Sequence, residues 1–158
     1  MHLEVLVEEE SARQALDVLL PRIVGSGVDF AIHSFKGKHD LLRKLPDRLK
    51  GYSRWEQCED MGSIGIVVLV DEDRQDCHEL KAKLEKAAAD AGLRTKTAAG
   101  KDERFLVLNR IAIEELEAWF FGDCDALRAA YPGIPPTIET TRRFRDPDAV
   151  KGGTWEQL

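Results

Sequence analysis

Residues 64–73 read Ile-Gly-Ile-Val-Val-Leu-Val-Asp-Glu-Asp, an apolar run that ends in three acidic residues. Its first seven residues are apolar apart from one glycine, and most of them are β-branched. A run of this kind, without polar alternation, is typical of a strand that is covered on both faces, as in a parallel α/β sheet. We therefore expect an α/β fold with a largely parallel sheet and helices on both of its faces.

The apolar run stops at Asp71-Glu72-Asp73. If the extended conformation continues, Asp71 and Asp73 point to the same side, at the end of the sheet where open α/β folds bind their ligands. Two carboxylates held close together repel each other unless a proton or a cation lies between them. A hard divalent cation such as Mg²⁺ suits carboxylate oxygen. A solvated acidic loop that caps the next helix is an equally good reading of these residues.

The composition is that of a globular protein, since the 158 residues are 43% hydrophobic and 33% charged. No apolar run is long enough to span a membrane, and the early glutamates at 4 and 8–10 do not fit a signal peptide. The three cysteines and four histidines lack the spacing of a disulfide framework or of a zinc site, which favours a cytoplasmic protein. The net charge of −6 rules out attraction of the whole surface to nucleic acid, so such binding would need a local basic patch or metal ions.

The rest of the chain alternates between strand and helix patterns. The expected strands are residues 2–7, 28–35, 64–70, 94–98 and 105–111. The expected helices are residues 11–24, 39–49, 77–91, 112–121 and 124–131, with Pro21 and Pro46 as points of kinking or interruption and 51–62 as an irregular loop. We expect one α/β domain over residues 1–121 and a helical and loop extension over 122–158. Because the last residues, 152–158, read as the start of a helix, we expect a longer protein.

Two charged clusters are further candidates for a functional site. Glu114 and Glu117 are neighbours on one face of the expected helix 112–121, where a buried Glu117 would supply a metal ligand and an exposed one would be an ordinary surface residue. The second cluster is either a solvated helix face or a surface that holds a phosphate backbone. It consists of the basic residues Lys36, Lys38, Arg43, Lys44, Arg48 and Lys50.

In its order of elements the chain resembles the Toprim fold of topoisomerases, primases and OLD-type nucleases. That fold has a glutamate after its first strand and an Asp-x-Asp motif after its third, and Glu8 and 71–73 match these places. The Toprim glutamate is often followed by glycine, where this chain has Glu9. The shape of the loop and the choice among Glu8, Glu9 and Glu10 therefore stay open.

The chain is more closely similar to the Toprim-like family called domain of unknown function 4276. The resemblance is carried by residues 7–11, 37–42, 68–77, 109–119, 145–148 and 152–155. It implies a further C-terminal segment. Because similar Toprim-like proteins are often encoded beside ATPases in anti-phage systems, it also implies an ATPase as a partner.

These patterns lead to two main hypotheses of function. In the first, the protein is a Mg²⁺-dependent (or Mn²⁺-dependent) nuclease or a related phosphoryl-transfer enzyme, in which Glu8, Asp71 and Asp73 hold the metal and Glu117 completes the acidic shell. Glu8 could instead act as a general base, and Lys38 would offset charge on the phosphate, with Lys36 and Arg110 as weaker candidates. In the second hypothesis, the protein is a non-catalytic Toprim-like module that binds an ATPase or nucleic acid. In a third hypothesis, the acidic cluster has only a structural role in a response-regulator-like sheet.

Overall fold

The computed structural model describes residues 1–58, 63–73, 75–113, 115–142 and 144–146. In these residues the sheet has four strands in the order β2-β1-β3-β4. They are β1 (His2–Val7), β2 (Asp29–Ser34), β3 (Ile64–Asp71) and β4 (Val107–Ala112). β1 pairs in parallel with both of its neighbours, so that His2 lies opposite Asp29 on one side and Ile64 on the other. The predicted parallel α/β architecture is confirmed.

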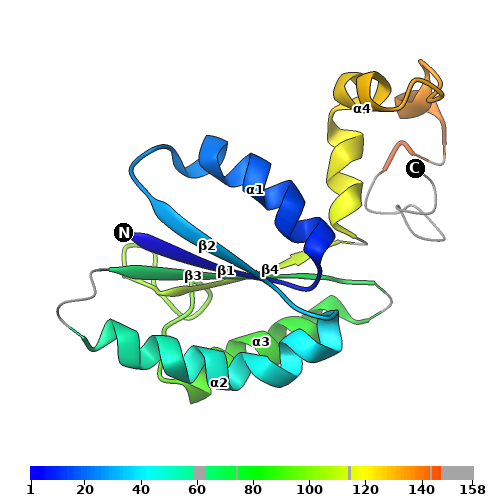
Figure 1. Cartoon of the computed structure of the whole chain (residues 1–158). Coiled ribbons are helices and arrows are strands. Elements are labelled where there is room, and N and C mark those ends of the chain that lie inside the picture. The colour runs from blue at the N-terminus through cyan, green and yellow to red at the C-terminus, as the bar shows by residue number, and fades with distance from the viewer. Residues whose placement is uncertain (59–62, 74, 114, 143, 147–158) are drawn as a thin grey trace. The chain divides into compact units, whose positions relative to one another are not determined.

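Helices cover both faces of the sheet, as predicted (Figure 1). α1 (Glu10–Val24) lies on one face, and α2 (Lys38–Glu56) and α3 (Cys77–Asp90) lie on the other. Each parallel strand pair needs a crossover of this kind, because a hairpin cannot return the chain to the starting end of the sheet.

The main hydrophobic core lies between the sheet and the two helices α2 and α3. Alternate residues of β3 point into it, in keeping with the period of two in a strand. They meet leucines that recur every three or four positions in the helices, which is the spacing of one helix face. The core residues of these three elements are Ile64, Ile66, Val68, Val70, Leu41, Leu45, Leu49, Tyr52, Leu80, Leu84 and Ala88.

The chain divides into two compact units, which are described separately. The first unit comprises residues 1–70 and 78–111, and the second comprises residues 71–77 and 112–158. The second unit contains the 3-10 helix η2 (Leu116–Gly122), the helix α4 (Cys124–Ala130) and the 3-10 helix η3 (Ile138–Thr140). Its small core is formed by Phe121, Leu127 and Ile138. The expected boundary between 121 and 122 stays a prediction.

The prediction of an α-helix over residues 112–121 was wrong. Ala112 still belongs to β4, and its carbonyl oxygen accepts a hydrogen bond from the Glu72 N–H at 2.8 Å. The helical turns begin at Leu116 and have 3-10 rather than α geometry. Leu116 is buried, whereas Ile113 and Phe120 are each more than a third exposed.

The extent of α2 also differs from the prediction. The helix passes through Pro46 without interruption and ends at Glu56, inside the segment expected to be a loop. Tyr52 is buried and Trp55 packs against the core, so the apolar stripe of the helix continues beyond Leu49. The expected strand 94–98 is reduced to one parallel bridge between Thr95 and Val107. The expected C-terminal helix start at 152–158 lies outside the described residues.

Candidate functional site

Glu8 is the carboxylate that directly follows β1, and it is buried, with 8% of its surface exposed. Its carboxylate oxygen Oε1 lies 4.0 Å from the ammonium nitrogen of Lys38, the first residue of α2. The side chains of both residues are at least nine-tenths buried. The positive end of the α2 dipole has the same sign as Lys38, so both favour a negative charge at this position. The structure thus brings two of the predicted site residues together.

The loop before α2 is fastened to the end of β1 by backbone hydrogen bonds. The Phe35 N–H donates to the Val7 carbonyl at 3.1 Å, and the Gly37 N–H donates to the Glu8 carbonyl at 3.0 Å. Gly37 has φ of +85° and ψ of 171°, a conformation that is essentially restricted to glycine. This glycine is therefore what allows the chain to turn into α2 with Lys38 beside Glu8.

The three consecutive glutamates have different surroundings. Glu9 is exposed and caps the start of α1 with its backbone. Glu10 is also exposed, and it forms an ion pair with Arg13 and accepts a hydrogen bond from the Ser34 hydroxyl at 2.8 Å. The hydrogen bonds from Arg13 and Ser34 lower the pKa of Glu10 to about 2. Glu8 is the one of the three that is buried, a distinction that the sequence left open.

Asp71 and Asp73 belong to the second unit, and the expected conformation of this segment was wrong. Asp71 is the last residue of β3 and is half-buried. The strand does not continue, because the Gln75 N–H donates to the Glu72 carbonyl at 3.1 Å and closes a turn. Within that turn Asp73 is exposed and has a positive φ of 53°. The argument that the two aspartates share one side of an extended strand therefore fails.

The remaining candidates are spread over both units. Glu117 is half-buried in η2 of the second unit, and Glu114, its expected neighbour, lies outside the described residues. Arg110 is exposed on β4, and Lys36 is exposed in the loop before α2. The candidates therefore form a buried pair, Glu8 and Lys38, in the first unit and an acidic set, Asp71, Asp73 and Glu117, in the second.

In the part of the chain that the structure describes, no three histidine, cysteine or carboxylate side chains form a group arranged to hold a metal ion. None of the described helices combines the length and the apolar character needed to cross a bilayer.

A second buried carboxylate, Glu4, was missed by the sequence analysis. Glu4 lies in the middle of β1 with 5% of its surface exposed, and three side chains hydrogen-bond to it. The Tyr52 hydroxyl donates to its Oε2 at 2.6 Å, and the Nε2 atoms of His33 and His2 lie 2.6 and 2.8 Å from Oε2 and Oε1. A sequence signal existed, since His2, Glu4 and Leu6 alternate on the face of β1 that carries the buried Leu6.

The network around Glu4 shifts the pKa of two groups. Burial acts to raise the pKa of Glu4, but the hydrogen bonds from Tyr52, His2 and His33 outweigh it and hold this pKa below its ordinary value. Burial and the hydrogen bond to Glu4 raise the pKa of Tyr52 above its ordinary value. Both shifts favour the ionised carboxylate and the protonated phenol at neutral pH.

Comparison with known proteins gives one match. The model of the family described as domain of unknown function DUF4276 matches residues 7–158, almost the whole chain. The chain belongs to this family. In this DUF4276 domain the match begins one residue before Glu8 and includes both the Glu8–Lys38 pair and the acidic segment after β3. No curated protein and no solved structure shows significant similarity to the chain.

Proposed function

We propose that this DUF4276 protein is a Toprim-like, Mg²⁺- or Mn²⁺-dependent phosphoryl-transfer enzyme of the nuclease type. The observation that carries the proposal is the buried Glu8 carboxylate beside Lys38 at the carboxyl end of β1. β1 and β3 are parallel neighbours, so their carboxyl ends lie at the same edge of the sheet, and β3 ends in Asp71. Open α/β sheets bind their ligands at this edge.

The donor chemistry of these residues fits a hard divalent cation. Glu8, Asp71 and Asp73 offer carboxylate oxygen only, which is the ligand type that Mg²⁺ and Mn²⁺ prefer. In this proposal, these three residues are metal ligands, and Glu117 would complete the acidic shell. A bound metal would supply positive charge at a phosphate and lower the pKa of a water molecule.

Lys38 has two roles in this proposal. Without substrate it compensates the charge of Glu8, because its ammonium nitrogen lies 4.0 Å from the carboxylate. With substrate it offsets negative charge on the reacting phosphate, as cationic groups do in phosphoryl transfer. The exposed Arg110 and Lys36 are secondary candidates for the same task.

The same ion pair supports a second function, that of a non-catalytic module. Since Lys38 already gives Glu8 a counter-charge, the carboxylate has a structural role that needs no metal. In that case the protein would act by binding a partner ATPase or nucleic acid. A role in phage defence and an ATPase partner follow from the Toprim-like resemblance alone and remain part of this proposal.

Metal titration separates the two functions. Mg²⁺ and Mn²⁺ are titrated into the protein and into the variants Asp71→Asn, Glu8→Gln and Glu9→Gln, with the heat of binding and the melting temperature as readouts. A ligand that binds only the folded state raises the melting temperature as it saturates. We expect saturable binding that Asp71→Asn and Glu8→Gln abolish and that Glu9→Gln, at an exposed neighbouring position, preserves.

Cleavage of labelled DNA and RNA oligonucleotides then tests the activity. We expect metal-dependent cleavage that is lost in Asp71→Asn and Glu8→Gln and kept in Glu9→Gln. Cleavage that survives both substitutions would refute the assignment. Absence of any metal binding, combined with tight binding of an ATPase, would establish the module instead.

A further inference from the structure

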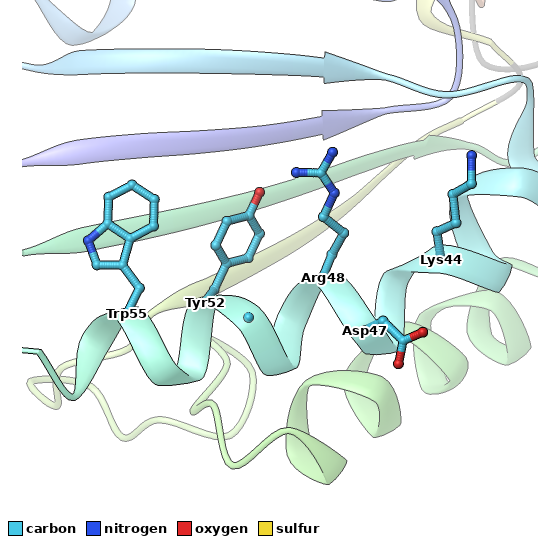
Figure 2. A pocket seen from close by; sticks show the side chains of 6 residues that line it. Lys44, Asp47, Arg48, Tyr52 and Trp55 are labelled. Atoms are coloured by element: carbon cyan, nitrogen blue, oxygen red, sulfur yellow. The ribbon is translucent and has the colours of Figure 1, made fainter.

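An open pocket along α2 combines positive charge with aromatic surface (Figure 2). The described residues that line it all come from this helix: Lys44, Asp47, Arg48, Gly51, Tyr52 and Trp55. Figure 2 shows that Lys44, Arg48, Tyr52 and Trp55 project from the same side of α2. This follows from their spacing of three or four positions, which repeats one face of a helix.

Glu4 fixes the two aromatic residues of the pocket, Tyr52 by a direct hydrogen bond and Trp55 through His2. The Tyr52 hydroxyl donates to the Glu4 carboxylate at 2.6 Å. The Trp55 ring stacks on the His2 ring, with 5.5 Å between the ring centroids and 20° between the planes, and His2 is itself bonded to Glu4. Burying a carboxylate is costly unless hydrogen bonds compensate it, and here these bonds fix the aromatic side chains. The pocket is therefore organised before any ligand arrives, which reduces the entropy that binding would cost.

The charge of α2 favours an anionic ligand. The helix carries six lysines and arginines against three carboxylates, a net charge of +3 in a chain whose net charge is −6. Lys44 and Arg48 are i, i+4 neighbours, and like charges at this spacing repel each other. Lys44 is balanced by Asp40, 2.7 Å from its ammonium nitrogen. Arg48 is exposed and lies at the pocket between Lys44 and Tyr52, so it is the main cation for an incoming anion.

We propose that this pocket binds one nucleotide unit of single-stranded nucleic acid. The phosphate would bind at Arg48 with support from Lys44, and the base would pack against the Trp55 indole. Proteins that bind single strands pair a cationic track with aromatic side chains on which bases stack, because every base has an aromatic face. The proposal rests on the proposed function in taking nucleic acid as the substrate. It goes beyond it in assigning a second binding site that needs no metal.

The test is fluorescence anisotropy with fluorescein-labelled oligo-dT and oligo-U of about 12 nucleotides, within the site sizes of single-strand binders. The full chain is used with EDTA present, so that cleavage does not interfere. The variants are Arg48→Ala, Trp55→Ala and Trp55→Phe. Arg54→Ala is the matched control, because it removes the same charge from an exposed position of α2 outside the pocket. Circular dichroism and the melting temperature confirm that each variant is folded.

We expect Trp55→Ala to weaken binding by roughly 5- to 150-fold, the effect of losing one base–aromatic stack. Trp55→Phe, which keeps an aromatic face, should retain most of the affinity. Arg48→Ala should reduce the slope of log Kd against log salt by about 0.7, the value for one phosphate contact on a single strand. Arg54→Ala should leave the affinity within about twofold, as expected for a surface change away from the site.

Two results would overturn the proposal. If Trp55→Ala binds as well as the unchanged protein, the base does not pack on the indole. If Arg54→Ala weakens binding as much as Arg48→Ala, α2 is only a positively charged face. Asp71→Asn separates this proposal from the proposed function, because it should abolish cleavage with metal and leave oligonucleotide binding in EDTA unchanged. If the protein binds oligonucleotides through Arg48 and Trp55 but never cleaves them, the binding role of the pocket is supported and the proposed nuclease activity is refuted.

Discussion

The Tyr52 hydroxyl donates a hydrogen bond of 2.6 Å to the Glu4 carboxylate, joining α2 to the interior strand β1 across 48 positions of sequence. Both residues are at least nine-tenths buried. A hydrogen bond to a charged acceptor contributes more to stability than a neutral one. The packing of α2 on the sheet therefore depends on a polar contact as well as on the leucines around it.

Tyr52→Phe removes this hydrogen bond and keeps the ring. We expect the free energy of unfolding to fall by about 1.5–3 kcal/mol, the usual range for a hydrogen bond to a charged group. Urea unfolding measures the change. The control is Tyr131→Phe, at an exposed position, which should change stability by less than about 0.5 kcal/mol. Equal effects of the two substitutions would contradict the prediction.

Glu4 should make the stability of the protein depend on acid pH. Its pKa in the folded protein is below its ordinary value of 4.5, because hydrogen bonds from Tyr52 and the two histidines outweigh the effect of burial. When the pH falls below 4.5 the unfolded chain takes up the proton first, so the stabilisation is present above that pH and is lost below it. Glu4→Gln lacks this titration, and urea unfolding at a series of pH values should show its stability converging with that of the unchanged protein as the pH falls. Curves that stay parallel throughout would show that Glu4 does not titrate in this way.

Lys38→Met tests the buried ion pair with Glu8. The substitution takes away the positive charge beside a carboxylate that is almost fully buried. We expect a loss of about 1–3 kcal/mol in the free energy of unfolding, below the loss for a fully buried pair, because the two charged atoms are 4.0 Å apart. Lys36→Met, at an exposed position two residues earlier, should have little effect. If chemical denaturation gives the same stability for both variants, the ion pair does not stabilise this end of the sheet.

Two glycines at α2 should respond to alanine with opposite signs. Gly37 precedes the helix with φ of +85°, which is strained for any residue with a Cβ, so Gly37→Ala should destabilise the protein by about 1–3 kcal/mol. Gly51 lies inside the helix, and a Cβ built there meets nothing within 4 Å. Gly51→Ala should therefore stabilise the protein by about 0.5–1 kcal/mol. Thermal melting of both variants checks the pair: a higher melting temperature for Gly37→Ala would contradict the account of Gly37, and a lower one for Gly51→Ala would contradict that of Gly51.

A strand can be predicted most reliably where it is a short apolar run. β3 shows this most clearly, since no polar residue interrupts it before Asp71. The end of α2 could not be predicted in the same way. Tyr52 and Trp55 continue the helix because they bind Glu4 and stack on His2, and these partners come from another element. A local pattern contains no information about such partners.

The candidate site was predictable in its residue types and less so in its geometry. The sequence placed a glutamate after the first strand, but the burial of Glu8 depends on its backbone bond to Gly37 and on Lys38, far along the chain. The period-two argument for Asp71 and Asp73 failed because a turn begins directly after the strand. In that turn Asp73 has a positive φ, which a pattern of apolar and charged residues does not indicate.

The position of β1 has a consequence for synthesis on the ribosome. This strand is synthesised before the other three, yet it lies between β2 and β3. Its pairing is complete only after Ile64, the partner of His2, has been synthesised 62 positions later. Until then the nascent chain exposes one edge of β1 together with the leucines of α2. Exposed strand edges and apolar surface promote aggregation during folding. Fragments that end before Ile64 should therefore be poorly soluble, and expressed fragments should include β3.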